Sequence, residues 1–405
     1  MKVRSITCFV NANPDGTVPD IAAAAQVSAR GNELFRKAGF EVQSSRLATQ
    51  AFSAYFPRDK ASAAALAQQM EQEIQASGFT YLSLGPALQD AEWAFACIPE
   101  ILAGTKNVFC TGIMADLKKG ISLAAVKACG EVISRCTPID PDGFTNLRFA
   151  ALANVPPHGP FFPAAYHDGS KPGFSLAMEC ADTALQCMQT GSTITQAGRM
   201  LTARLEETAD KLDYLCAIIC RETGFEFFGF DFSPAPFPDD ACSLAGAMEA
   251  LGAEIGKHGS VMAAAILASA LDSGTWKKAG FNGMMLPVLE DSLLAQRTEG
   301  ANFSVKDVLL YSSVCGTGLD TIPLPGDATP AQLSSLLLDV AALSIRLDKP
   351  LTARLMPIPG KKAGDKTGFD FAFFANGRVM ELYAQPVNGL LAGDEVLHLT
   401  PRHRR

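Results

Sequence analysis

The chain has 405 residues, of which 48% are hydrophobic and 19% charged, enough apolar material for one large core or two medium ones. Its 34 lysines and arginines against 42 acidic residues give a net charge of −8, so no overall positive field attracts nucleic acid or an anionic membrane. We therefore expect no nucleic-acid partner and no membrane partner. The basic cluster "PRHRR" at 401–405 is predicted to be a short solvated tail.

The first residues and the cysteines bear on location and metal content. The stretch "KVRSITCFV" alternates like a strand and lacks the apolar core of a secretion signal, and the apolar stretch at 261–271 is too short to span a bilayer. We expect a cytoplasmic protein. The eleven cysteines form no CxxC pair and the five histidines show no zinc-type spacing, so we predict no metal site, and no pattern names a cofactor.

Strand-like and helical segments alternate along the first half of the chain, and no low-complexity linker divides it. Strands are predicted at 3–11, 40–49, 79–87, 107–114, 146–154 and 174–180. Helices are predicted at about 18–38, 60–77, 88–103, 118–136 and 194–222.

The second half continues in the same way. Strands are predicted at 225–233, 280–289, 319–325, 350–358, 368–375 and 378–384. Helices are predicted near 239–252, 259–272, 304–315 and after Thr329, where Thr329, Pro330 and Gln332 form a capping-box pattern. This order predicts one α/β domain over residues 1–405 with a mainly parallel sheet or barrel. Periodicity alone leaves open sheet and closed barrel as alternatives.

Cys315 stands in "CGTGLD", after the helix predicted at 304–315. A glycine in the helix C-cap would leave the thiol at the negative end of the helix dipole, which disfavours the thiolate. Cys315 is therefore either a packed small residue or a nucleophile that needs a base from elsewhere in the fold. Gly318 would let the backbone approach a ligand, and Asp320 places a carboxylate in a strand, where packing gives little reason for one.

Asp231 and Ser233 lie on one face at the end of the strand predicted at 225–233, where α/β proteins place ligand groups. The alternative is a loop in which both side chains cap local backbone donors.

His258, Gly259 and Ser260 come directly before a predicted helix, so that Ser260 could be its cap and the free amides could hold an anion. The alternative is a structural histidine at a helix start. His167, at the glycine turn in "AAYHDGS", has the same two interpretations.

Two further charged positions are candidates for the site. Glu290 and Asp291 follow a predicted strand, and adjacent residues on a strand point to opposite faces, so at most one faces a cavity and a solvated face is the default. Arg354 lies inside the strand predicted at 350–358. A strand-borne arginine has either an anionic ligand or an internal carboxylate partner.

Several stretches occur together in an order that resembles the domain of unknown function 711 family (uncharacterised protein family 0210). They are "VRSIT", "GFDFSPAPFP", "KHGS", "LPVLED", "CGTGLDTIPLP" and "RLMPIPGKKAGD", and the likeness extends from about residue 3 to about residue 384. The resemblance implies a fold similar to pyruvate formate-lyase: a ten-stranded α/β barrel with a loop inserted inside it. In the glycyl-radical relatives a glycine near the C-terminus stores the radical, and "NGRVMELYAQPVNG" at 376–389 lacks that sequence.

These observations predict a non-radical enzyme that acts on a small anionic metabolite in the barrel interior. The alternative is a small-molecule-binding or regulatory protein of the same fold without turnover. Apolar helices also allow a homo-oligomer. The catalytic candidates are Asp231, His258 and Cys315. The ligand-binding candidates are His167, Ser233, Gly259, Ser260, Glu290, Gly318, Asp320 and Arg354.

Overall fold

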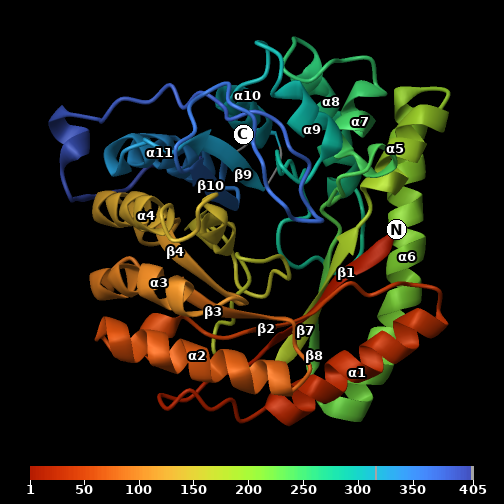
Figure 1. Cartoon of the computed structure of the whole chain (residues 1–405). Helices are drawn as coiled ribbons and strands as arrows, with labels where there is room; N and C mark the ends of the chain where they lie inside the picture. Colours follow the sequence, from red (N-terminus) through yellow and green to blue (C-terminus); the bar gives the residue numbers. More distant parts are fainter. Residues whose placement is uncertain (315–316, 403–405) are drawn as a thin grey trace.

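The computed structural model describes residues 1–314 and 317–402, and it folds into one curved sheet with helices along its outer side (Figure 1). The strands are β1 (Lys2–Phe9), β2 (Ser45–Ala48), β3 (Tyr81–Ala87), β4 (Val108–Asp116), β5 (Gly120–Ser122), β6 (Phe149–Ala153), β7 (Gly173–Glu179), β8 (Glu226–Asp231), β9 (Gly318–Pro325), β10 (Leu351–Ile358) and β11 (Val396–Leu397). The α-helices are α1 (Ile21–Lys37), α2 (Lys60–Ala76), α3 (Glu92–Gly104), α4 (Leu123–Cys136), α5 (Ala181–Thr190), α6 (Ile194–Thr223), α7 (Leu244–Glu249), α8 (Ser260–Asp272), α9 (Ser292–Arg297), α10 (Val305–Ser312) and α11 (Pro330–Leu347).

The sheet has the strand order β8-β7-β1-β2-β3-β4-β6-β10-β9, with β5 and β11 beside β4. Strands β1, β2, β3, β4 and β6 run parallel to one another, as do β7 with β8 and β9 with β10. The two antiparallel pairs, β1 with β7 and β6 with β10, join these groups. The predicted α/β class with a mainly parallel sheet is confirmed.

The two edge strands of this path, β8 and β9, are linked through the segment 278–287. Phe230 of β8 forms a parallel bridge with Lys278, and Asp320 of β9 forms one with Pro287. Neither bridge extends into a ladder, so in the described residues the sheet is not closed by continuous hydrogen bonding. The strand predicted at 280–289 is therefore an irregular connection, with Gly280 and Asn282 at positive φ and one bridge inside it, at Pro287.

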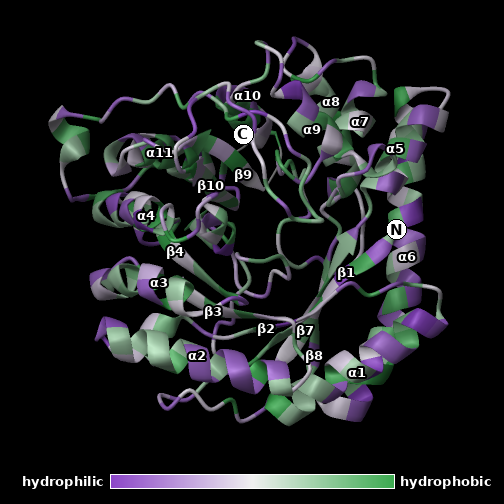
Figure 2. Ribbon diagram, viewed as in Figure 1, coloured by the Kyte–Doolittle hydropathy of each residue, from purple (hydrophilic) through white to green (hydrophobic). Residues whose placement is uncertain are grey.

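Two helices begin at capping boxes that their local sequence specifies. In α11, Thr329 and Gln332 bond each other's backbone amides in a capping box, and in α10 the Asp307 carboxylate accepts from both the amide and the hydroxyl of Ser304. Helix α6 turns an apolar stripe inward and ends at Gly224 in the left-handed region. Figure 2 shows the same alternation of hydrophilic and hydrophobic residues on the outer helices. No helix in the described part of the chain combines the length and apolar character needed to cross a membrane.

The structure also differs from the prediction in several elements. Helices α5 and α9 and strands β5 and β11 have no counterpart in the prediction. The strands predicted at 368–375 and 378–384 are irregular, with a single bridge between Lys366 and Arg378. The alternating phenylalanines there pack as a cluster instead, since Phe369, Phe371 and Phe374 all lie against Phe144. An alternating pattern can therefore reflect ring packing in a loop instead of a sheet face.

Candidate functional site

A cavity of about 150 Å³ lies on the inner side of the sheet. Its wall includes side chains of β1, β2, β3, β4, β6, β9 and β10, whereas their neighbours along each strand, such as Leu47 and Leu82, belong to the apolar core under the helices. One side of the cavity is apolar. Its residues include Phe109, Phe161, Phe162, Phe281, Met285 and Phe371.

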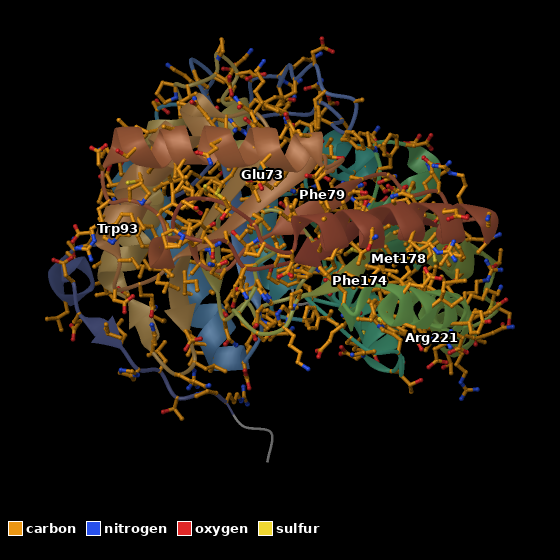
Figure 3. All side chains as sticks on the ribbon, turned by 90° about the horizontal axis from the view of Figure 1, so that it is seen from below. Glu73, Phe79, Trp93, Phe174, Met178 and Arg221 are labelled. Carbon is orange, nitrogen blue, oxygen red and sulfur yellow. The ribbon has the colours of Figure 1, made fainter. Side chains whose placement is uncertain are left out.

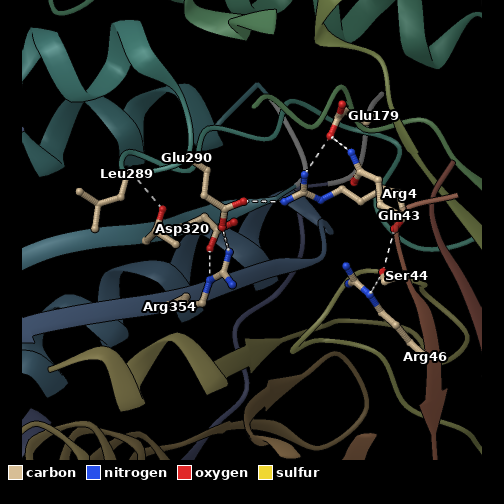
Figure 4. A network of polar contacts seen from close by, with 10 residues as sticks. Arg4, Gln43, Ser44, Arg46, Glu179, Leu289, Glu290, Asp320 and Arg354 are labelled. Carbon is tan, nitrogen blue, oxygen red and sulfur yellow. Dashed lines mark hydrogen bonds and ion pairs between the residues drawn. The ribbon is translucent and has the colours of Figure 1, made fainter. Parts of the chain in front are cut away.

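The other side carries a chain of alternating charges (Figure 4). Arg4 contacts Glu179 at 3.2 Å and Glu290 at 2.8 Å. Arg354 contacts the second oxygen of Glu290 at 2.8 Å and reaches Asp320 at 2.5 Å through its Nε. The side chains of these five charged residues are at most 14% exposed. Glu290 thus bridges two arginines, and the partner of Arg354 is internal.

Burial shifts the pKa of Asp320 and of Arg354 in this chain of charges. It raises the pKa of Asp320, and the Arg354 guanidinium offsets part of that rise. For Arg354, burial lowers the pKa but the carboxylates of Asp320 and Glu290 more than compensate, so the net pKa is raised. The pKa of Asp320 is therefore raised above its ordinary value, and its side chain faces the cavity.

Arg46 stands apart from this chain of charges, although it lines the same cavity. Its Nε donates to the Ser44 hydroxyl at 3.0 Å, and its guanidinium lies over the rings of Tyr81 and Phe162 at 5.8 and 5.2 Å. Among residues 1–314 and 317–402, no carboxylate forms an ion pair with it and no acceptor contacts its terminal nitrogens. Burial, with a contribution from Arg4, lowers the pKa of Arg46 to about 9, so the group stays charged at neutral pH.

Asp231 and Ser233 lie outside the cavity lining and are both fully buried. The Asp231 carboxylate accepts from the amides of Ser233, Phe281 and Asn282 and from the Ser233 hydroxyl, at 2.6–2.9 Å. Burial raises the pKa of Asp231, and these hydrogen bonds oppose the rise. The geometry matches the alternative in which both residues cap local donors, here those of segment 278–287. Their predicted roles in binding and catalysis stay predictions.

His258 is exposed at the surface before α8, outside the cavity lining. Gly259, with φ of +103°, holds the N-cap position predicted for Ser260. The Ser260 amide and hydroxyl both donate to the Lys257 carbonyl. The prediction of Ser260 as the cap is wrong, because the left-handed turn that starts this helix needs the residue without a side chain.

Gly318 is needed for packing: a Cβ there would lie 2.2 Å from the Thr352 carbonyl oxygen of β10. His167 is buried in a separate cluster with His158 and Asp168, outside the cavity lining. Cys315 lies outside the described residues.

The side chains of Glu290 and Asp291 point to different places, although the two residues lie in a turn before α9 and not in a strand, and the solvated face expected for them is wrong. Glu290 enters the cavity wall at 7% exposure and Asp291 is fully buried. The Asp291 carboxylate accepts from the Ser243 hydroxyl and the amides of Leu244 and Leu294, and so caps both α7 and α9.

Two residues of the cavity wall, Arg4 and Arg46, were not predicted from the sequence. The signal was available, because both lie within apolar, strand-like stretches, as Arg354 does. Arg4 stands in "KVRSITCFV" and Arg46 in "FEVQSSRLAT". A strand-borne arginine indicates a special environment wherever it occurs, and the criterion applied to Arg354 selects all three.

Fold and cavity together define a mixed α/β protein with a charged internal site. The family model described as "Uncharacterised ACR (DUF711)" matches residues 1–372, and the chain belongs to this family, as its motifs predict. A UPF0210 protein of Pyrobaculum aerophilum is 32% identical over 286 residues, which cover 66% of this chain and 61% of the relative. The match therefore spans less than two thirds of that protein. A UPF0210 protein of Pyrobaculum islandicum is 28% identical over 394 residues, 90% of this chain and 87% of the relative.

Proposed function

We propose that the cavity binds a small carboxylate with an apolar body, and that Arg46 is the group that holds the carboxylate. The observation that carries this proposal is that Arg46 has no carboxylate partner among the described residues. The two other arginines of the cavity wall, Arg4 and Arg354, both form ion pairs with carboxylates. A guanidinium with two free terminal nitrogens matches the two oxygens of a carboxylate. An anion would also relieve the repulsion that Arg46 experiences from Arg4.

The size and the lining of the cavity restrict the apolar body of the ligand. A volume of about 150 Å³ is similar to that of cavities which admit one benzene-sized molecule. The wall of Phe162, Phe281 and Met285 favours an aromatic ring or a branched aliphatic group. Small aromatic and branched aliphatic carboxylates are therefore the ligand class, and phosphorylated metabolites are disfavoured by the lone free guanidinium.

The catalytic form of this proposal is a non-radical enzyme in which Asp320 transfers a proton to or from the bound carboxylate compound. The pKa of Asp320 is raised toward neutral pH relative to that of an ordinary aspartate, and the side chain faces the cavity. Glu290 and Arg354 would hold it in position. Asp231 and His258 stay predictions for this role, but neither lines the cavity.

The second candidate is a binding or regulatory protein without turnover. What favours it is that Glu290 and Asp320 are both engaged with arginines, so that neither oxygen pair is wholly free to act on a substrate. This form needs Arg46 and the apolar wall alone.

Binding is tested by calorimetry with benzoate and with its uncharged analogue benzamide. We expect benzoate to bind and benzamide to bind at least about tenfold more weakly, as loss of a charge-assisted contact implies. Arg46→Met should remove the preference for benzoate. Arg221→Met is the matched control, because Arg221 is exposed on α6 (Figure 3) and is not among the residues that line the cavity. Equal binding of both compounds, or an equal effect of the two variants, would contradict the proposal.

Turnover is tested separately, with a branched 2-keto acid in deuterated water. A catalytic Asp320 should promote exchange of the protons next to the keto group, and Asp320→Asn should abolish this exchange while the keto acid still binds. Binding without exchange in the wild-type protein supports the regulatory candidate.

We also infer the ten-stranded, pyruvate formate-lyase-like barrel as the complete form of this fold. Supporting it are the three parallel groups of strands, the two antiparallel pairs that join them, and the bridges from segment 278–287 to both edges. The cytoplasmic location and the homo-oligomer remain predictions.

A further inference from the structure

A second group of polar side chains lies in the connection between β6 and β7, outside the cavity lining. His158 Nε2 lies 3.1 Å from His167 Nδ1 and 3.2 Å from an Asp168 carboxylate oxygen. The same oxygen lies 3.7 Å from His167 Nδ1. Three potential ligand atoms thus form a nearly equilateral triangle.

The size of this triangle fits a tetrahedral metal ion. Zinc lies about 2.0–2.1 Å from histidine nitrogen and carboxylate oxygen, and a regular tetrahedron of that radius has edges of about 3.3–3.4 Å. The three measured edges, 3.1, 3.2 and 3.7 Å, lie on either side of that value. The fourth corner would be open to water, because the Asp168 side chain is 43% exposed.

The surrounding hydrogen bonds also suit metal binding. His167 Nε2 lies 3.1 Å from the Ser170 carbonyl oxygen, which can only accept, so the proton is on Nε2 and the lone pair is on Nδ1, inside the triangle. The amide of Ser170 donates to the Asp168 oxygen at 2.9 Å and fixes it. The His158 ring is stacked on Phe228, with centroids 3.8 Å apart. A backbone carbonyl behind a ligating histidine is the usual outer partner of such sites.

We propose that His158, His167 and Asp168 bind one divalent transition-metal ion of the zinc type. Two imidazoles and one carboxylate favour zinc, cobalt or nickel over magnesium and calcium, which prefer oxygen. In the competing arrangement no metal is bound, and the protonated Nε2 of His158 donates a hydrogen bond to His167 and Asp168. The metal-bound and hydrogen-bonded arrangements differ in whether the folded chain takes up metal.

The ion would hold the base of a functional loop. His158 and His167 stand at the two ends of segment 158–167, where the His158 amide also donates to the Tyr166 carbonyl at 2.9 Å. Between them, residues 161–164 form part of the cavity wall. The metal site is thus independent of the carboxylate ligand, but it would fix the position of the wall against which that ligand packs.

The test uses the full chain, freed of metal with a chelator and then titrated with cobalt(II). We expect one cobalt ion per chain with the intense visible absorption of tetrahedral coordination, displacement by zinc, and no saturable binding of magnesium. A folded wild-type chain that binds no zinc or cobalt stoichiometrically would overturn the proposal in favour of the hydrogen-bonded arrangement.

Variants assign the ligands. Asp168→Asn, at a partly exposed position, should weaken zinc binding on the order of 100-fold or more and remove the tetrahedral cobalt spectrum. His258→Ala removes an exposed histidine outside the cluster and should change neither. Zinc should also raise the melting temperature of the wild type and of His258→Ala, but not of Asp168→Asn. Equal loss in both variants would show that the ion binds elsewhere.

Discussion

Asp231, which is fully buried, and Asp320, whose side chain is 14% exposed, lie in the two edge strands of the same sheet and have opposite surroundings. Asp231 accepts hydrogen bonds from backbone amides and a hydroxyl, and it lies outside the cavity lining. Asp320 shares an arginine with Glu290 and faces the cavity. A buried carboxylate at a strand end is therefore not by itself a functional group. The kind of partner it has, backbone amide or charged side chain, separates a structural residue from a candidate for chemistry.

The largest effect is expected at the partner of Asp320. Arg354→Met should lower the free energy of unfolding by about 3–5 kcal/mol, because it leaves the buried charges of Asp320 and Glu290 with one arginine fewer. Chemical denaturation measures this loss, with Arg221→Met as the exposed control. A loss below about 1 kcal/mol would mean that these charges are screened as surface pairs are.

At the other aspartate, Asp231→Asn should cost about 2–3 kcal/mol, because the new amide nitrogen cannot accept the bonds that the carboxylate accepts. Benzoate binding, measured below the melting temperature, should be retained, since Asp231 is outside the cavity lining. Loss of binding in a folded Asp231→Asn protein would break the distinction between the two aspartates and restore the role predicted from sequence.

A smaller effect concerns the pH dependence of stability. Because burial raises the pKa of Asp320, the folded chain holds this proton more tightly than the unfolded chain does. The resulting contribution to the free energy of unfolding is fully present below the ordinary pKa of 3.8 and is lost as pH rises through the raised pKa. As pH rises from about 4 to about 7, the free energy of unfolding of the wild type should therefore fall relative to that of Asp320→Asn. A difference that stays constant with pH would contradict the raised pKa.

The smallest effect is expected at His258. Because the side chain is exposed and outside the cavity lining, His258→Ala should change the free energy of unfolding by no more than about 0.5 kcal/mol and should leave benzoate binding unchanged. Chemical denaturation measures the free energy of unfolding, and calorimetry measures benzoate binding. A large drop in exchange of the keto acid protons would instead support the proton-transfer role predicted from sequence.

The sequence predicted most helices because helix ends are specified locally. The capping boxes at Ser304 and Thr329 need only residues three positions apart. Strand-like patterns were less secure, since the phenylalanines of 368–375 alternate but pack as rings around Phe144. Such packing depends on residues more than 200 positions away and leaves no local trace.

For the site, sequence reasoning selected Asp320, Glu290 and Arg354, which the fold brings together, and also Asp231 and His258, which lie outside the cavity. Residue type and position in a strand could not separate the residues inside the cavity from those outside it, because both sets include a carboxylate near the end of a strand. The separation depends on which strands become neighbours. The same holds for His158, whose ligand-like distance to His167 arises from a turn of the loop that the spacing of histidines did not indicate.

Segment 158–167 carries the cavity wall between the two histidines, so one short loop belongs to two proposed binding sites. Linkage between two ligands of one chain is reciprocal: if the metal ion strengthens carboxylate binding by some factor, the carboxylate strengthens metal binding by the same factor. The loop would then make occupancy of the cavity depend on the availability of the metal. Such a protein would report the joint presence of two small molecules, whether or not it transforms either of them.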